Sequence, residues 1–150
     1  MRYLKESFIK AKPEVVFGFH ELPDAFERLV PPWENVRIIQ KAEISKIGSK
    51  AILEQTLFGL FRQKWVAEHT VYEPPHLFVD VQVSGPFKVW MHHHRFVEFE
   101  GGTFLRDEIE FDPGFSIIGE LGAKLLILPK IEKMFAYRHE VTREWCEGQS

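Results

Sequence analysis

Residues 43–112 are dominated by alternation of apolar and polar side chains. Turn signals interrupt the alternation at Ile47-Gly48, Gly59, Pro74-Pro75, Gly85-Pro86 and Gly101-Gly102. Successive side chains of a strand point to opposite faces, so this pattern is typical of strands that bury one face. Connections this short join only antiparallel neighbours, and the segment therefore predicts an antiparallel meander.

Before the meander, the pattern predicts a strand, two short helices and a second strand. Residues 2–10 and 34–41 alternate as strands. Between them, Pro13 is well placed in the first turn of one helix, and Pro23-Asp24 begins another that Pro31-Pro32 must end.

Residues 117–145 have the periodicity of a long helix. Several of its residues lie near one stripe: Leu121, Leu125, Leu128, Glu132, Phe135, Arg138 and Thr142. Pro129 interrupts the pattern and predicts either a kink or a short helix followed by a longer one that starts at Pro129.

These elements predict an α+β fold in a single domain over residues 1–150. A curved antiparallel sheet of about seven strands is expected to wrap around the C-terminal helix, with the two short helices between strands one and two. The long helix is the only predicted element large enough to cover the sheet. A hollow is expected between the sheet and this helix.

The two longest predicted strands meet at Gly101-Gly102, a pair that tolerates the positive φ angles of a type I′ turn. With those glycines as the loop, His94 lies opposite Ile109 and His92 lies opposite Phe111. This register also fixes which side chains of the hairpin share a face.

One face of this hairpin is charged, with Arg95 expected opposite Glu108 and His93 expected opposite Glu110. The other face is apolar apart from two histidines and an aspartate: Trp90, His92, His94, Phe96, Leu105, Asp107, Ile109 and Phe111. Burying a polar group unpaired costs roughly 1–3 kcal/mol, so these three groups need partners, water or a ligand. The second face therefore predicts a lined pocket.

Composition and charge exclude several classes of protein. A formal charge of −3, a pI near 6.2 and the lack of a basic run argue against a nucleic-acid partner. The N-terminus has no apolar segment of a secretory signal, and no apolar run approaches the length of a membrane span. The single cysteine, Cys146, fits a reducing compartment, so a cytoplasmic location is expected.

Serine, thiol and phosphate chemistry are not supported. There is no G-x-S-x-G motif, and the sequence places no histidine beside Cys146. Gly119-x-x-Gly122 is too short for a phosphate-binding loop and follows no strand. Fourteen Phe and four Trp favour instead a core, or a pocket for an apolar molecule, built from aromatic side chains.

A series of short motifs spans residues 8–140: Phe17-x-Phe19-His20, Pro31-Pro32-Trp33, Gly48-Ser49, Trp65-x-Ala67-x-His69, Pro74-Pro75, Phe78-x-Asp80-x-Gln82, Gly85-Pro86-Phe87, Trp90-x-His92-x-His94-x-Phe96, Thr103-x-Leu105-x-Asp107 and Phe135-x-Tyr137-Arg138. In order and spacing they resemble the START-related (SRPBCC, helix-grip) superfamily. The resemblance is greatest to its polyketide cyclase/dehydrase-like ligand-binding branch, some of whose members are labelled cell division inhibitors. The resemblance implies a deep apolar cavity for a small hydrophobic molecule or lipid but no particular reaction, because the superfamily mixes carriers, receptors, chaperone regulators and enzymes. Pro129 departs from the unbroken C-terminal helix that this resemblance implies.

His92-x-His94 is the sharpest candidate for chemistry. On a strand both rings project to one side, roughly 7 Å apart at the backbone, which is compatible with two ligands of one metal ion. His69 or Asp80 could add a ligand from another strand. Two ligands on a strand are only half of a metal site, and aromatic neighbours suit an organic ligand better, so neither a metal nor another cofactor is expected.

Two other interpretations of this pair stay open. The histidines are wall residues that hydrogen-bond to Asp107, Gln82 or water, or they belong to an acid/base site in which Asp107 orients His94 and raises its pKa. In the expected register Asp107 lies diagonally across the ladder from His94.

The residues expected to line the pocket and contact its ligand are Trp65, His69, Asp80, Trp90, His92, His94, Phe96, Asp107, Ile109, Phe111 and Phe135. The face of Asp80 depends on the loop at Ser84-Gly85-Pro86. An odd, three-residue loop turns Asp80 to the side of His92, and we favour it because Gly85 then takes a left-handed bulge position.

Three functions follow from this pocket. The first is a binding module that holds a small hydrophobic or aromatic molecule, anchored by His92, His94 and Asp107 with help from His69 and Asp80. The second is a cyclase or dehydratase with His94 and Asp107 as acid and base. The third is an interaction module whose groove contacts a partner protein.

Overall fold

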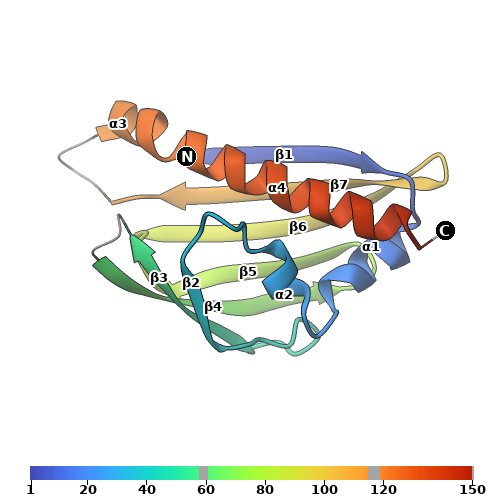
Figure 1. Ribbon diagram of the computed structural model, residues 1–150, viewed down its shortest axis with the longest axis horizontal. Coiled ribbons are helices and arrows are strands. Elements are labelled where there is room, and N and C mark those ends of the chain that lie inside the picture. Colours follow the sequence, from blue (N-terminus) through green and yellow to red (C-terminus); the bar gives the residue numbers. More distant parts are fainter. Residues whose placement is uncertain (58–60, 115–118, 150) are drawn as a thin grey trace.

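The computed structural model describes residues 1–57, 61–114 and 119–149 (Figure 1). Within them, seven antiparallel strands form one sheet in the order β1-β7-β6-β5-β4-β3-β2. The strands are β1 (Arg2–Ile9), β2 (Val36–Gln40), β3 (Lys50–Leu57), β4 (Phe61–Glu73), β5 (Leu77–Ser84), β6 (Val89–Phe99) and β7 (Gly102–Asp112). The helices are α1 (Pro13–His20), α2 (Ala25–Leu29), α3 (Gly119–Leu126) and α4 (Leu128–Glu147).

The predicted α+β helix-grip arrangement is confirmed. Strands β2 to β7 form a meander, β1 returns to pair with β7, and α1 and α2 lie between β1 and β2. Figure 1 shows the curved sheet wrapped around the long helix α4. The predicted turn at Gly59 and the predicted helix start at Ile117 lie outside the described residues.

Helix α4 covers one half of the sheet. On β1, Tyr3 and Lys5 donate hydrogen bonds to the carboxylate of Glu132 on α4, at 2.5 and 2.8 Å. Beneath the first half of α4, Ile131 and Phe135 pack into one apolar cluster with Trp90, Ile109 and Phe111. A second cluster beside α1 includes Phe17, Phe19, Phe96, Leu105 and Cys146. These clusters hold α4 directly against the β1–β7–β6 side of the sheet.

The break at Pro129 takes the second of its two predicted forms, a short helix followed by a longer one. Helix α3 ends at Leu126, and Pro129 lies in the first turn of α4, where a missing backbone N–H costs nothing. The predicted helix stripe is wrong at its beginning, because Leu121 and Leu125 are 71% and 67% exposed. The buried residues of α4 are Ile131, Phe135, His139, Thr142 and Cys146.

The loop of the long hairpin differs by one residue from its prediction. Glu100 and Gly101 have the positive φ angles, 46° and 79°, so the loop is Glu100-Gly101 rather than Gly101-Gly102. His92 therefore lies opposite Ile109, and His94 lies directly opposite Asp107. The register moves by two residues, which preserves the side-chain face of every residue in the hairpin.

The pairs on the outer face of the hairpin change with this register. His93 lies opposite Glu108 rather than Glu110, and Arg95 lies opposite Arg106. Arg95 still reaches Glu108 diagonally, with its Nε donating to Oε2 at 3.1 Å. The charged character predicted for this face is therefore retained with different neighbours.

Among the described residues, no helix is both long enough and apolar enough to cross a membrane.

The corrected loop makes a prediction about stability. Glu100 adopts a left-handed conformation that costs an ordinary residue about 1–2 kcal/mol, whereas Asn-Gly is the preferred pair in a type I′ turn. We predict that Glu100→Asn raises the free energy of unfolding by about 0.5–1 kcal/mol in urea titrations. Gly101→Ala serves as the opposite control and should lower it. If Glu100→Asn destabilises the protein, Glu100 is an ordinary strand residue and this loop assignment is wrong.

Candidate functional site

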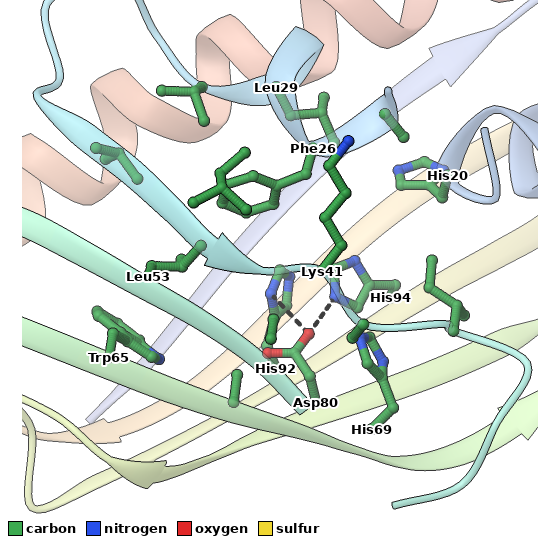
Figure 2. Close-up of a pocket in the computed structure, with 18 of the residues that line it drawn as sticks. His20, Phe26, Leu29, Lys41, Leu53, Trp65, His69, Asp80, His92 and His94 are labelled. Atoms are coloured by element: carbon green, nitrogen blue, oxygen red, sulfur yellow. Dashed lines mark hydrogen bonds and ion pairs between the residues drawn. The ribbon is translucent and has the colours of Figure 1, made fainter. Parts of the chain in front are cut away.

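A cavity of about 620 Å³ lies on the inner face of the sheet. Strands β3 to β6 form its floor, and α2, β2 and residues 41–45 cover it (Figure 2). Helix α4 contributes only Met134 and Arg138 to the lining described. The hollow was predicted between the sheet and the C-terminal helix, but α4 packs too closely on β1 and β7 to leave space there. Most of the cover comes instead from residues 20–45.

Apolar side chains form most of the cavity wall. Leu53 and Trp65 lie on the floor, while Phe26 and Leu29 extend into the cavity from α2 (Figure 2). Trp65 also packs edge-on against Trp90, with 5.2 Å between ring centroids. This wall suits the flat or aliphatic body of a small organic molecule.

The polar part of the wall comes from adjacent strands. Asp80 on β5 lies directly opposite His92 on β6 and shares its face with His94, as the favoured odd-loop interpretation predicted. The left-handed position expected for Gly85 is wrong, because the positive φ angles among the described glycines belong to Gly48, Gly101 and Gly114. His69 on β4 pairs across the ladder with Asp80. Trp65, His69, Asp80, Trp90, His92 and His94 all line the cavity.

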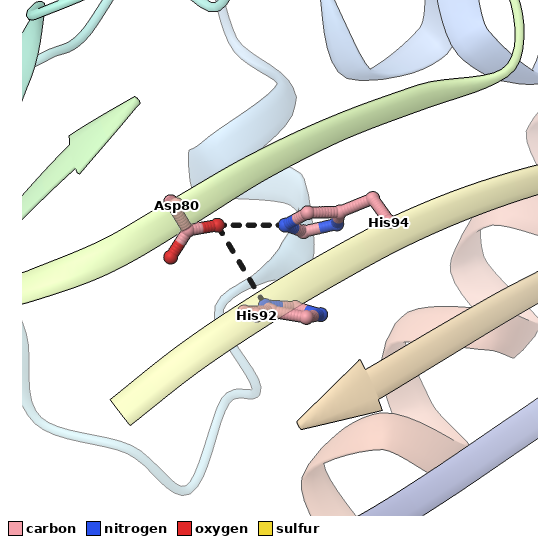
Figure 3. Close-up of side chains that lie close together, drawn as sticks. All are labelled: Asp80, His92 and His94. Carbon is pink, nitrogen blue, oxygen red and sulfur yellow. Dashed lines mark hydrogen bonds and ion pairs between the residues drawn. The ribbon is translucent and has the colours of Figure 1, made fainter. Parts of the chain in front are cut away.

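Asp80 and His94 are in direct contact at the cavity wall. His94 Nε2 donates a hydrogen bond to Asp80 Oδ2 at 2.7 Å, and His92 Nδ1 lies 3.7 Å from the same oxygen (Figure 3). The ring of Phe78 stacks on that of His94, with centroids 3.9 Å apart and planes 16° apart. The ring of His92 is also close, with its centroid 3.6 Å from that of His94. His94 is therefore held by packing as well as by its hydrogen bonds.

Asp107 lies behind the histidines rather than on the cavity wall. His92 Nε2 and His139 Nε2 donate to its two oxygens at 2.8 and 2.7 Å, and His94 Nδ1 lies 3.2 Å from Oδ1. His139 Nδ1 in turn accepts from the hydroxyl of Ser7 at 2.8 Å. One buried carboxylate thus fixes the orientation of three imidazoles.

The charges of this cluster follow from its contacts. Burial opposes ionisation of Asp107 and Asp80, but the facing histidines outweigh it, so the pKa of Asp107 lies well below 3.8 and that of Asp80 falls to about 2. Burial also opposes protonation of His94, yet hydrogen bonds to Asp107 and Asp80 raise its pKa above 6.5. For His92, burial and the neighbouring His94 lower the pKa. Because each ring nitrogen of His94 faces a carboxylate oxygen, the cluster favours the protonated form of His94 and the neutral form of His92.

Several residues expected in the pocket lie elsewhere. Phe96, Ile109, Phe111 and Phe135 are buried in the two apolar clusters and do not border the cavity. Phe96, Ile109 and Phe111 share the sheet face of His92, but α4 and α1 cover that part of the face. Phe135 lies on α4 itself. Only alternation along the strands was available from the sequence, and alternation does not show where along the sheet a helix lies.

Sequence reasoning missed two functional candidates on α4. His139 completes the set of groups on Asp107, and its place among buried residues spaced by three or four, from Ile131 to Cys146, is the signal that could have revealed it. Arg138 was assigned to the helix stripe and to one of the family motifs but not to the pocket, and it borders the cavity. Its Nε donates to the backbone oxygen of Leu29 at 3.3 Å, and burial lowers the pKa of its guanidinium.

One other buried group bears on the site. Among the described residues, His69 Nδ1 is the buried side-chain nitrogen or oxygen that has no hydrogen-bond partner. Burial lowers the pKa of His69, which favours the neutral ring. A buried polar atom in this state is costly, so a group in the cavity that hydrogen-bonds or coordinates it would be stabilising.

Comparisons with known proteins agree with this architecture. A family model described as "Polyketide cyclase / dehydrase and lipid transport" matches residues 9–127. No curated protein matches the chain. Among solved structures, the protein TTHA0849 from Thermus thermophilus is 14% identical, with a TM-score of 0.77 over 100% of this chain and 99% of that chain.

Two longer proteins contain a similar unit. The di-domain ARO/CYC StfQ from the steffimycin biosynthetic pathway is 12% identical, with a TM-score of 0.76 over 99% of this chain and 51% of that chain. A nucleoside-diphosphate sugar epimerase from Corynebacterium glutamicum is 28% identical, with a TM-score of 0.68 over 95% of this chain and 28% of that chain. The chain therefore corresponds to about half of the first protein and to a smaller part of the second.

The burial of His20 predicts how stability depends on pH. His20 Nδ1 donates to the backbone oxygen of Val16 at 2.8 Å, and burial together with the nearby His94 lowers its pKa from 6.5 to about 4. Between these values the unfolded chain binds the proton more readily than the folded protein does, so stability falls as the pH falls from 6.5 to 4. The full difference corresponds to roughly 3 kcal/mol.

We predict that His20→Leu removes this contribution. Relative to the parent protein, the variant should gain up to roughly 3 kcal/mol as the pH is lowered from 7 to 4. Urea unfolding at a series of pH values measures the difference. Parallel stability curves for the two proteins would contradict the assignment of a buried, neutral His20.

Proposed function

The chain belongs to the family described as polyketide cyclase/dehydrase and lipid transport, and on that premise we propose that it binds a small hydrophobic or aromatic molecule in the cavity beneath α2. The observation that carries this proposal is a cavity with an apolar wall and one polar corner. Its volume, about 620 Å³, lies within the usual range for sites that enclose a small organic ligand.

The polar corner favours a ligand with a hydroxyl or carbonyl group. Asp80 accepts hydrogen bonds at the wall and can hold a hydroxyl of the ligand, whereas both ring nitrogens of His94 already face carboxylate oxygens. Arg138 borders the same cavity and adds a positive charge, which suits an acidic or enolic oxygen. The aromatic body of such a ligand would lie against Trp65 and Phe26.

A cyclase or dehydratase is the second candidate, and the contact between His94 and Asp80 favours it. A carboxylate and an imidazolium 2.7 Å apart can remove a proton from a carbon beside a carbonyl and donate one to the departing hydroxyl, which leaves as water. In this candidate reaction Asp80 is the acid/base partner of His94, a role first expected of Asp107. The oxygens of Asp107 are occupied by three imidazoles. Asp107 would then position the histidines without touching the substrate.

We also propose that the chain forms one domain and that the protein is cytoplasmic. β1 near the N-terminus and α4 near the C-terminus pack together through Glu132, which supports a single domain over the whole chain. The lone cysteine is buried and unpaired, which fits a reducing cytoplasmic environment.

A cavity-blocking variant tests the binding proposal. Ala67 borders the cavity, whereas Lys64 on the same strand is exposed on the other face. We predict that a panel of hydrophobic and aromatic compounds contains members that raise the melting temperature of the parent protein and of Lys64→Trp. Ala67→Trp should lose this stabilisation, because the new ring occupies the space of the ligand.

Native mass spectrometry of the purified protein provides a second measurement, because a retained small molecule should be present in the parent protein and absent from Ala67→Trp. Equal stabilisation of both tryptophan variants would place the binding outside the cavity.

Turnover separates the binding function from the enzymatic one. If the protein is an enzyme, His94→Gln should abolish the reaction while ligand affinity stays within a few fold of the parent value.

A further inference from the structure

Three side chains at the polar corner of the cavity present atoms that can bind a metal ion. We propose that Asp80, His92 and His94 bind a divalent transition-metal ion, with Zn²⁺ as its simplest representative. One ligand atom from each residue lies within 4.8 Å of the others. All three residues come from the paired strands β5 and β6 and border the cavity, so the ion would have open positions for water or for a ligand group.

The environment of the two histidines supports this site more strongly than their spacing does. Metal-binding histidines generally donate their second ring N–H to a carboxylate, a backbone carbonyl or water, which fixes the ring and makes the ligating nitrogen more basic. Here Asp107 Oδ1 faces His92 Nε2 at 2.8 Å and His94 Nδ1 at 3.2 Å. The opposite nitrogens, His92 Nδ1 and His94 Nε2, are therefore directed towards Asp80 (Figure 3).

Asp107 is itself held in place. Its second oxygen accepts from His139 Nε2 at 2.7 Å, and His139 Nδ1 accepts from Ser7 Oγ at 2.8 Å. The arrangement leaves the two ligating nitrogens with little freedom to turn away.

His69 provides an independent observation at the same corner. Its side chain is 8% exposed, its Nδ1 has no hydrogen-bond partner among the described residues, and it lies opposite Asp80 in the ladder. A water molecule bound to an ion beside Asp80 would give this nitrogen the partner that it lacks.

The donor atoms favour a transition metal over calcium or magnesium. Two imidazole nitrogens and one carboxylate oxygen suit Zn²⁺ and Fe²⁺, whereas Ca²⁺ and Mg²⁺ prefer oxygen ligands alone. Ligands about 2.0–2.2 Å from a tetrahedral Zn²⁺ lie roughly 3.3–3.6 Å apart, close to the 3.7 Å between His92 Nδ1 and Asp80 Oδ2. His94 Nε2 and Asp80 Oδ2 are 2.7 Å apart and would have to separate by somewhat less than roughly 1 Å to hold the same ion. The ion would replace the proton shared by His94 Nε2 and Asp80, which passes to solvent.

Binding of Zn²⁺ alone to tag-free protein, stripped with a chelator and dialysed, tests this inference by calorimetry. The absorption of bound Co²⁺ reports its coordination. We expect one ion per chain with a Kd of about 10 µM or tighter, and visible Co²⁺ bands typical of four or five ligands. His94→Ala and Asp80→Asn should each weaken Zn²⁺ binding by more than about 100-fold, and Asp107→Asn by about 10- to 100-fold.

His93→Ala is the matched control, since His93 lies between the two ligands in sequence but on the outer face of the sheet. The affinity of the His93→Ala variant for Zn²⁺ should stay within about two-fold of the parent value. Circular dichroism confirms that each variant is folded. If His94→Ala does not fold, the more conservative Asp80→Asn still tests the site.

Two outcomes overturn the inference: a Kd above about 1 mM, or equal losses in His93→Ala and Asp80→Asn. The inference shares the cavity with the proposed organic ligand but does not rest on it. Repeating the compound panel in the presence of a chelator distinguishes the metal proposal from the organic-ligand proposal. If compounds stabilise the protein but Zn²⁺ does not bind, the metal proposal alone is wrong. If Zn²⁺ binds but no compound stabilises the protein, the organic-ligand proposal alone is wrong.

Discussion

One buried carboxylate, that of Asp107, is the constraint on which the rest of the site depends. A buried carboxylate is strongly destabilising unless charged or polar partners surround it. Asp107 has three imidazole partners, and they come from β6 and from α4, so satisfying this one charge ties the helix to the sheet. Through His92 and His94 the same charge also determines which ring nitrogens are presented to the cavity, beside Asp80.

The position of the cavity follows from how the aromatic core is divided. Helix α4 and helix α1 cover β1, β7 and part of β6 with two apolar clusters. The remaining inner face, on β3 to β5, is covered by a short helix and a loop that do not fill it. Asp80 and His94 lie at the boundary between these halves, where packed core meets open space. A group at such a boundary can be held rigidly on one side and reach a ligand on the other.

Alternation along the strands predicted the faces of the hairpin correctly even though its loop was displaced by one residue. Displacing a two-residue loop moves the register by two, and side chains alternate with a period of two, so His92, His94 and Asp107 stayed together. The helix was less predictable. Pro129 lies in the first turn of a new helix, and the stripe was continued across it from Leu121 and Leu125, which are exposed. That stripe included Phe135 and Thr142 but missed His139 between them. The cavity and the packed core also lie on the same face of the sheet, and the alternation of side chains along a strand cannot show where one ends and the other begins.

The protonation of the buried imidazoles reports whether Asp107 orients three histidines. Long-range nitrogen–proton NMR spectra of metal-free protein at neutral pH report which ring nitrogen of each histidine carries a proton. The account predicts protons on Nε2 of His92 and His139, on both nitrogens of His94, and slow exchange with water at each. A ring of His92 or His139 without a proton on Nε2, or loss of all these signals by rapid exchange, would contradict it.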